Sequence, residues 1–285
     1  MPNLSRLFIF GRDNLAHLEN PELESKILLL AATGLSEEQF YTSPKWIPPL
    51  SSRRKFYRLI ALRCSGIPTA YLVGQQEFWS LPFLVGEGVL IPRPETELLV
   101  EEALKLIFPD KKALVIDVGT GCGNIAISLA KERPKALILA TDISAEAILW
   151  AKRNLEFHQV NNVELVQGDG LSPLKDSLPE KGIDLIISNP PYVSLQEWEE
   201  LSPSIKDYEP RLALLAGEHG LEVIEKLIRE APLLLKPGGI LLFEIGWNQA
   251  DKVRDLFGPQ WDLVNFRSDY QGIPRVCRAV LKLEN

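Results

Sequence analysis

A polar amide, two prolines and an aromatic residue follow an apolar run that predicts a buried strand. The run covers residues 182–188, and the four residues after it are Asn189, Pro190, Pro191 and Tyr192. Open α/β sheets hold their ligands beyond the carboxyl ends of their strands, so this tetrapeptide is expected at a ligand site.

The chemistry that would need these residues is transfer of a group onto an NH2 nitrogen whose lone pair is delocalised into a carbonyl or an aromatic ring. The Asn189 side-chain oxygen and the Pro190 carbonyl could each accept one hydrogen of that NH2 and so orient it. Proline fixes φ and removes a competing donor, and Tyr192 offers a flat face for a planar amide or base. A strand that simply ends in a proline turn is the structural alternative.

A glycine loop precedes this strand in the sequence. Residues 115–118 predict a strand and residues 124–130 a helix, and between them lie Gly119, Thr120, Gly121, Cys122 and Gly123. Glycine allows a sharp bend and a close ligand approach, and the helix adds its positive end. The spacing is neither the dinucleotide fingerprint nor a phosphate-binding loop with Gly-Lys-Ser/Thr. A tight strand-to-helix turn without a ligand is the alternative, and Cys122 is interpreted as a small filler and not as a nucleophile.

Two acidic residues follow the next two predicted strands. Asp142 ends the strand of residues 136–141, and an acid about 20 residues beyond such a loop usually accepts ribose hydroxyls. Asp169 ends the strand of residues 163–168, where its carboxylate could accept an adenine amine while Gly170 lets the ring lie close. Each acid alone could be a helix cap or a solvated loop residue, but together with the loop they predict a nucleoside pocket.

With these motifs the chain resembles the class I methyltransferases that use S-adenosylmethionine, and within them the release factor glutamine methyltransferases. The resemblance rests on the glycine loop and on four further motifs, which are residues 91–97 (Ile-Pro-Arg-Pro-Glu-Thr-Glu), 188–192 (Ser-Asn-Pro-Pro-Tyr), 208–211 (Tyr-Glu-Pro-Arg) and 269–275 (Asp-Tyr-Gln-Gly-Ile-Pro-Arg). Asn-Pro-Pro-Tyr alone is shared with adenine-directed DNA methyltransferases and some RNA enzymes. The combination of motifs is more specific than any one of them.

The resemblance implies transfer of a methyl group from S-adenosylmethionine, which leaves S-adenosylhomocysteine, to the side-chain amide nitrogen of the glutamine in the Gly-Gly-Gln motif of peptide chain release factors. It assigns the cofactor to Gly119 through Gly123, Asp142, Asp169, Gly170 and Asn189, and the glutamine to Asn189 through Tyr192. Some relatives carry a large aromatic residue where this chain has Gly170, which leaves adenine stacking on that side open. The proton acceptor and the preferred release factor are also left open.

The expected fold is a doubly wound, seven-stranded, mostly parallel α/β sheet of the Rossmann-like class I type, with a small N-terminal helical domain. Residues 1–75 are predicted as a helical substrate-recognition domain, 76–92 as a β-hairpin linker and 93–285 as the methyltransferase domain. The helical domain could grip the release factor or merely stabilise the whole. Helices are expected at 21–33, from Ser36, and at 52–64, 98–107 and 221–235, and a loop-rich lid at 201–216. Residues 77–83 and 88–91 predict the hairpin, 240–245 a fifth strand, and 261–266 with 275–283 an antiparallel edge.

Charge and composition bear on the partners. Lys and Arg number 31 against 38 Asp and Glu, and the only dense basic cluster is Arg53–Lys55, so a protein substrate is favoured over a nucleic acid. The three histidines are scattered, so no metal site is expected. Arg93 could be a plain surface charge or could orient Glu95, Glu97 or the substrate loop, and it is not assigned a catalytic role. The odd number of widely spaced cysteines predicts free thiols in the reducing cytoplasm, and the absence of a long apolar run predicts no membrane contact. The protein is expected to be a monomer. The alternatives are an amino methyltransferase acting on an exocyclic amine of DNA or RNA, and a binder that keeps the fold without catalysis.

Overall fold

The computed structural model describes residues 1–175 and 182–283, and these form two compact units. The first unit comprises Met1–Gln75 and Ser202–Tyr208, and the second comprises Gln76–Leu201 and Glu209–Asn285. Residues 202–208 therefore cluster with the helical unit, although the sequence division placed them in the methyltransferase domain. The roles assigned to the two parts remain predictions.

The first unit is a small helical bundle. Helices α1 (Leu4–Asn14), α2 (Pro21–Thr33) and α4 (Leu50–Cys64) pack on one another, and the short helices are α3 (Glu37–Thr42), α5 (Thr69–Val73) and α10 (Pro203–Lys206). As the sequence predicts, α2 begins with proline and ends before Gly34 in the left-handed region, and α3 begins with a capping box between Ser36 and Gln39. The buried core of this unit includes Leu7, Leu28, Leu29, Phe56 and Ile60.

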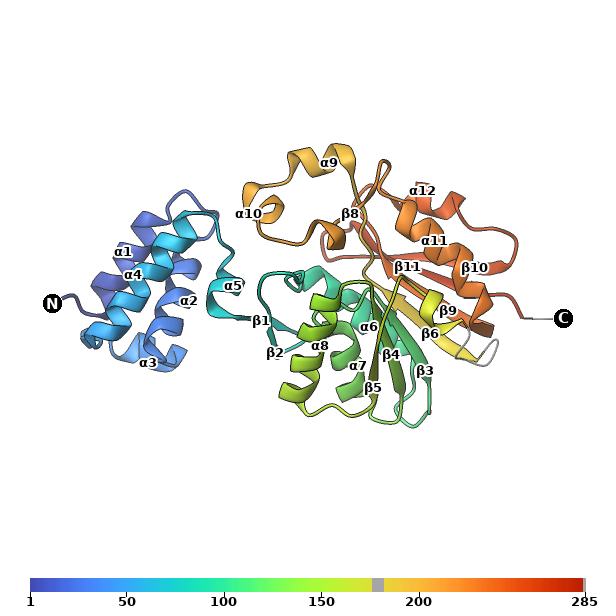
Figure 1. Ribbon diagram of the computed structural model, residues 1–285, viewed down its shortest axis with the longest axis horizontal. Helices are drawn as coiled ribbons and strands as arrows, with labels where there is room; N and C mark the ends of the chain where they lie inside the picture. Colours follow the sequence, from blue (N-terminus) through green and yellow to red (C-terminus); the bar gives the residue numbers. More distant parts are fainter. Residues whose placement is uncertain (176–181, 284–285) are drawn as a thin grey trace. The chain divides into compact units, whose positions relative to one another are not determined.

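The second unit contains a seven-stranded sheet among the described residues, as predicted (Figure 1). Its strand order is β10-β11-β9-β6-β3-β4-β5. The bounds are β3 (Leu114–Val118), β4 (Leu137–Asp142), β5 (Val163–Gln167), β6 (Ile183–Ser188), β9 (Leu235–Glu244), β10 (Trp261–Ser268) and β11 (Pro274–Leu281). Strands β5, β4, β3, β6 and β9 are parallel, and β11 runs antiparallel to both β9 and β10. The predicted antiparallel edge is thus confirmed.

Helices cover both faces of this sheet (Figure 1). Helices α6 (Glu97–Leu106), α7 (Asn124–Glu132) and α8 (Ala145–His158) pack on one face, and α11 (Glu222–Glu230) and α12 (Ala250–Asp255) on the other. Strands β3 and β6 are nearly continuous apolar runs because both of their faces are buried. None of the described helices is both long and apolar enough to cross a bilayer.

Two elements differ from the predicted ones. The hairpin consists of β1 (Gln75–Phe78) and β2 (Leu81–Leu84), so residues 77–83 do not pair as one strand with 88–91. Trp79 and Ser80 both have positive φ, and this two-residue turn closes the hairpin before the residues that were expected to join 77–83 to 88–91. Strand β9 begins at Leu235 and not at Ile240, because an irregularity in its pairing with β6 accommodates residues 236–239.

The chain between β6 and α11 leaves the sheet in a long excursion. Strand β7 (Val193–Ser194) pairs with β8 (Leu215–Gly217), and α9 (Leu195–Glu200) follows β7 directly. The predicted loop-rich segment 201–216 contains α10 and the short turn Arg211–Ala213, so it is mostly irregular as expected. The predicted helix 221–235 is shorter than expected, since α11 ends at Glu230 and a short turn leads into β9.

Replacing Phe56 with alanine should destabilise the first unit. Phe56 is fully buried in α4, and truncating a buried Phe costs about 3–5 kcal/mol, so hydrogen-exchange protection of α1, α2 and α4 should fall by about 100-fold or more. Tyr57→Ala is the matched control in the same helix, because Tyr57 is 39% exposed and its ring lies at the edge of the core, beside the rings of Phe10 and Phe56. Equal losses in the two variants would contradict the assigned core.

Candidate active site

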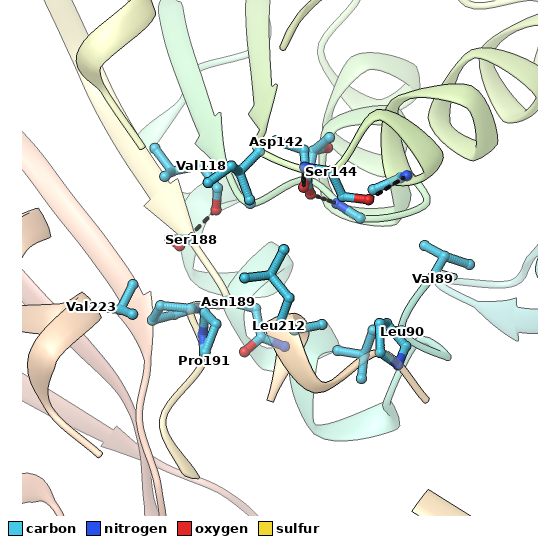
Figure 2. A pocket seen from close by; sticks show the side chains of 18 of the residues that line it. Val89, Leu90, Val118, Asp142, Ser144, Ser188, Asn189, Pro191, Leu212 and Val223 are labelled. Carbon is cyan, nitrogen blue, oxygen red and sulfur yellow. Dashed lines mark hydrogen bonds between the residues drawn. The ribbon is translucent and has the colours of Figure 1, made fainter. Parts of the chain in front are cut away.

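The parallel register of three strands brings the predicted site residues to one edge of the sheet. Val118, the last residue of β3, pairs with Ser188 at the end of β6 and with Thr141 near the end of β4. Ser188 Oγ also donates a hydrogen bond to the Val118 carbonyl at 2.7 Å. The segments that follow these strands line a cavity of about 570 Å³, with Asp142 and Ser144 on one side and Asn189 and Pro191 on the other (Figure 2).

The glycine loop has the geometry of a cradle. Gly119, Gly121 and Gly123 all have positive φ, between 57° and 84°, which L side chains rarely adopt. The amides of Gly119 and Thr120 donate to the Thr141 carbonyl at 2.8 and 2.9 Å, which fixes the bend. No atom lies within 4 Å of where a Gly119 Cβ would stand, so this face of the loop is open. Gly123 does not line the cavity, since its α-carbon faces Ile127 and Ala151.

Asp142 presents a carboxylate with spare acceptor capacity. Its Oδ2 accepts a hydrogen bond from the Gly121 amide and its Oδ1 one from the Ser144 amide, both at 2.9 Å. Burial raises the pKa of Asp142, and these backbone hydrogen bonds act against that rise. A carboxylate can accept about four hydrogen bonds, so acceptor capacity is left for the hydroxyls of a ligand.

Asp169 and Gly170 line the same cavity, as predicted, and Asp169 forms an ion pair there. Lys226 of α11 also lines the cavity, and its Nζ lies 2.5 Å from Asp169 Oδ2. Lys226 was not predicted from the sequence, because nothing in an amphipathic helix marks one lysine as facing a pocket. Gly170 has φ +60°, and its carbonyl accepts a hydrogen bond from Thr141 Oγ1.

Asn189 is held by a buried chain of hydrogen bonds. Its Nδ2 donates to Thr96 Oγ1 at 3.0 Å, and Thr96 Oγ1 donates to Glu244 Oε2 at 2.7 Å. Thr96 and Glu244 are 1% and 2% exposed. Burial raises the pKa of Glu244 to about 7, against the hydrogen bonds from Thr96 and Tyr192 and the charge of Arg275.

Tyr192 does not line the cavity, although the sequence predicts it beside Asn189, Pro190 and Pro191 at the ligand site. Asn189, Pro190 and Pro191 line the cavity, whereas the Tyr192 ring packs against the apolar core and its hydroxyl donates to Glu244 Oε1 at 3.1 Å. Burial, together with the charge of Glu244, raises the pKa of Tyr192, so the hydroxyl remains a donor.

Neither Thr96 nor Glu244 was predicted as a site residue from the sequence. Thr96 lies inside the motif 91–97, and Glu244 is a carboxylate in the otherwise apolar run 240–245, which was the available signal.

Arg93 holds a loop within the excursion between β6 and α11. It forms an ion pair with Glu209, which is 5% exposed and also accepts a hydrogen bond from the Ile91 amide at 3.1 Å. Of the two possibilities raised by the sequence, orienting the loop is therefore supported. In contrast, Glu97 accepts a hydrogen bond from the Trp79 amide.

Two buried groups of the loop region have shifted titration. Burial raises the pKa of Cys122 to about 12, so the thiol stays protonated, in agreement with its interpretation as a small filler. Asp117, fully buried in β3, accepts from Thr120 Oγ1 at 2.7 Å, and no described residue donates to its Oδ1. Burial raises the pKa of Asp117 to about 7.

Known proteins resemble the chain over most of its length. The family model of the PrmC N-terminal domain matches residues 7–74, and that of the methyltransferase small domain matches residues 94–202. A release factor glutamine methyltransferase of Koribacter versatilis is 39% identical over 92% of this chain and 94% of its own length. The release factor glutamine methyltransferase of Salmonella typhimurium is 39% identical over 90% and 91%.

One solved structure illustrates the fold. A 16S rRNA methyltransferase of Thermus thermophilus, in complex with AdoMet and guanosine, has a TM-score of 0.52 and 17% identity, and the match covers 73% of this chain and 50% of that one. At this identity the likeness shows the fold alone.

Asp117 should make stability depend on pH. In the unfolded chain its pKa is ordinary, so between about pH 4 and pH 7 the folded state binds more protons and stability falls as pH rises. Asp117→Asn removes this term, so its free energy of unfolding relative to the unaltered protein should rise by about 2–3 kcal/mol between pH 5 and pH 8. Denaturant unfolding at several pH values measures it, and a difference that does not change with pH would contradict the assignment.

Proposed function

The chain belongs to the release factor glutamine methyltransferases, and on that basis we propose that it transfers a methyl group from S-adenosylmethionine to the side-chain amide nitrogen of the glutamine in the Gly-Gly-Gln motif of release factors. The observation that carries the proposal is the placement of Asn189 and Pro190 on the wall of the same cavity as the glycine loop and Asp142. The hydrogen-bond acceptors for an amide and the loop that would bind a nucleoside thus face the same cavity.

The residues of the loop side fit the cofactor. Gly119, Gly121 and the neighbouring Thr120 and Cys122 would take the methionine part and the sugar against open backbone, and Gly123 would set the turn into α7. Asp142 would accept the two ribose hydroxyls with its free lone pairs. Asp169 and Gly170 would border the adenine, with Lys226 beside them. S-adenosylmethionine supplies a methyl group that is already electrophilic because it is bound to a sulfonium sulfur.

The residues of the strand side fit the glutamine. No described residue donates a hydrogen bond to Asn189 Oδ1 or to the Pro190 carbonyl, so both can accept from the substrate NH2. Two acceptors fix the plane of the amide and the direction of its nitrogen lone pair. Alignment of this kind is worth up to about 7–11 kcal/mol in well-oriented reactions. Tyr192 would support this wall through the bond to Glu244.

A protein substrate is favoured over a nucleic acid. The relatives that match over about nine-tenths of the chain are release factor enzymes, whereas the likeness to the rRNA enzyme is one of fold. The net charge of −7 also gives no general attraction to a phosphate backbone. The proposal places the enzyme in the cytoplasm as a monomer, with residues 1–75 as the part that recognises the body of the release factor.

Incubation with release factor and S-adenosylmethionine should add one methyl group to the glutamine of Gly-Gly-Gln, because the two hydrogens of its planar NH2 satisfy both acceptors. Peptide mass spectrometry measures the product, and release factor with that glutamine changed to alanine is the control. Purified DNA and rRNA are tested in parallel with labelled methyl donor. Label in nucleic acid alone would overturn the protein-substrate proposal.

Substitutions on the two sides of the cavity should separate binding from turnover. Asn189→Ala should reduce turnover by at least about 100-fold while the affinity for S-adenosylmethionine changes little, because a positioned acceptor for the reacting amide is lost. Asp142→Ala should weaken cofactor binding by about 10-fold or more, because hydrogen bonds to a charged group are lost. Isothermal titration and single-turnover kinetics measure these effects. An Asn189→Ala enzyme with normal turnover would contradict the assignment.

A further inference from the structure

The hydrogen bonds behind Asn189 have a fixed direction. Glu244 as a carboxylate can only accept, so the single hydroxyl proton of Thr96 goes to Glu244 Oε2 at 2.7 Å. The Thr96 oxygen then has only lone pairs to offer to Asn189. The group of Asn189 that faces Thr96 must therefore be the NH2, at 3.0 Å, and not the carbonyl oxygen.

This direction decides which end of the asparagine amide reaches the substrate. The two ends of an amide have nearly the same shape, so packing alone does not choose between them. Because the NH2 is bound to Thr96, Oδ1 is the end left available, and no described residue donates to it. An acceptor at this position is what a glutamine NH2 requires, whereas a donor there would repel it.

We propose that Thr96 and Glu244 are positioning residues that set the polarity of Asn189, so that its oxygen and not its nitrogen faces the substrate amide. This inference rests on the proposed function. Tyr192 extends the same arrangement, because its hydroxyl donates to the other oxygen of Glu244 at 3.1 Å. Both oxygens of Glu244 are thus occupied by donors, and the carboxylate accepts from two sides of the wall.

Protonation of Glu244 would disturb this arrangement. A protonated carboxyl group carries a donor of its own, so Thr96 or Tyr192 would have to reverse its hydrogen bond. Thr96 and Tyr192 hydrogen-bond to Glu244, and the charged groups that act on it are Arg275 of β11 and Glu95. Arg93 acts on Tyr192. Burial raises the pKa of Glu244 to about 7 despite Arg275, so this reversal falls within the range of ordinary assays.

The test compares Thr96→Val, Thr96→Ser and Glu244→Gln with the unaltered enzyme on release factor. Thr96→Val keeps the shape but offers no acceptor to the Asn189 NH2, so kcat should fall by about 10- to 100-fold with cofactor affinity unchanged within about twofold. Thr96→Ser keeps the hydroxyl and should retain kcat within about threefold. Equal loss in both variants, or normal kcat in Thr96→Val, would overturn the inference.

Glu244→Gln tests the direction itself. The new amide offers one acceptor to two donors, so one hydroxyl must reverse, and a reversed Thr96 would turn the Asn189 NH2 toward the substrate. A release factor with glutamate in place of the reacting glutamine should then inhibit Glu244→Gln more strongly than it inhibits the unaltered enzyme, since a carboxylate accepts from NH2. In addition, kcat of the unaltered enzyme should fall as pH drops below about 7, and Glu244→Gln should lack this dependence. Unchanged inhibition and an unchanged pH profile would overturn the inference.

A measurement that needs no turnover separates this inference from the proposed function. In the ¹H–¹⁵N spectrum, the Asn189 side-chain amide should be protected from exchange in the unaltered enzyme and in Thr96→Ser but not in Thr96→Val. An amide signal that is the same in all three proteins would contradict the role of Thr96. Absence of methyl transfer to release factor by the unaltered enzyme, with the expected amide signals, would instead contradict the proposed function and leave the polarity of Asn189 established.

Discussion

The in-register parallel pairing of β3 with β4 and β6 is the constraint on which the site depends. Val118 stands opposite Thr141 on one side and Ser188 on the other, so the three chains leave the sheet at one level. The period of a strand is two residues, and a slip by one would exchange its two faces. Such a slip of β6 would turn the residues of Asn-Pro-Pro-Tyr away from the loop that faces them. The bond from Ser188 Oγ to the Val118 carbonyl ties the strand ends together at this level.

Two buried carboxylates orient the hydroxyl groups around the site, and burying each of them costs free energy. Glu244 and Asp117 are almost fully buried, and their raised pKa values show that burial outweighs the hydrogen bonds they accept. A carboxylate is nevertheless well suited to fix the direction of neighbouring hydroxyls, because in its ionised form it has no proton to donate. Glu244 directs Thr96 and Tyr192, and Asp117 directs Thr120 in the glycine loop. Burying these carboxylates therefore lowers the stability of the fold at neutral pH, but it fixes the direction of the hydrogen bonds in the site.

The excursion between β6 and α11 passes from the second unit into the first and back. It leaves the sheet at Asn189, and residues 202–208 cluster with the first unit, where the Tyr208 hydroxyl donates to the Ser65 carbonyl at 2.9 Å. The next residue, Glu209, belongs to the second unit and is held by Ile91 and Arg93. Two motifs that are far apart in the sequence, 91–97 and 208–211, therefore meet in one ion pair. This pairing explains why Arg93 is neither a plain surface charge nor a partner of Glu97.

The sequence by itself determined the order of the elements and the sheet edge at which the candidate site lies. Apolar runs that end in glycine, acid or Asn-Pro-Pro-Tyr predict strands whose carboxyl ends converge, because parallel pairing leaves no other arrangement for them. Only the tertiary structure decided which buried partners orient those residues. Thr96 and Glu244 lie 93 and 55 positions from Asn189 along the chain, and no local pattern couples them, since a hydrogen bond across a core depends on packing and not on spacing. The same reason accounts for Lys226 beside Asp169, for Tyr192 in the core, and for the hairpin that closes at Trp79 and Ser80.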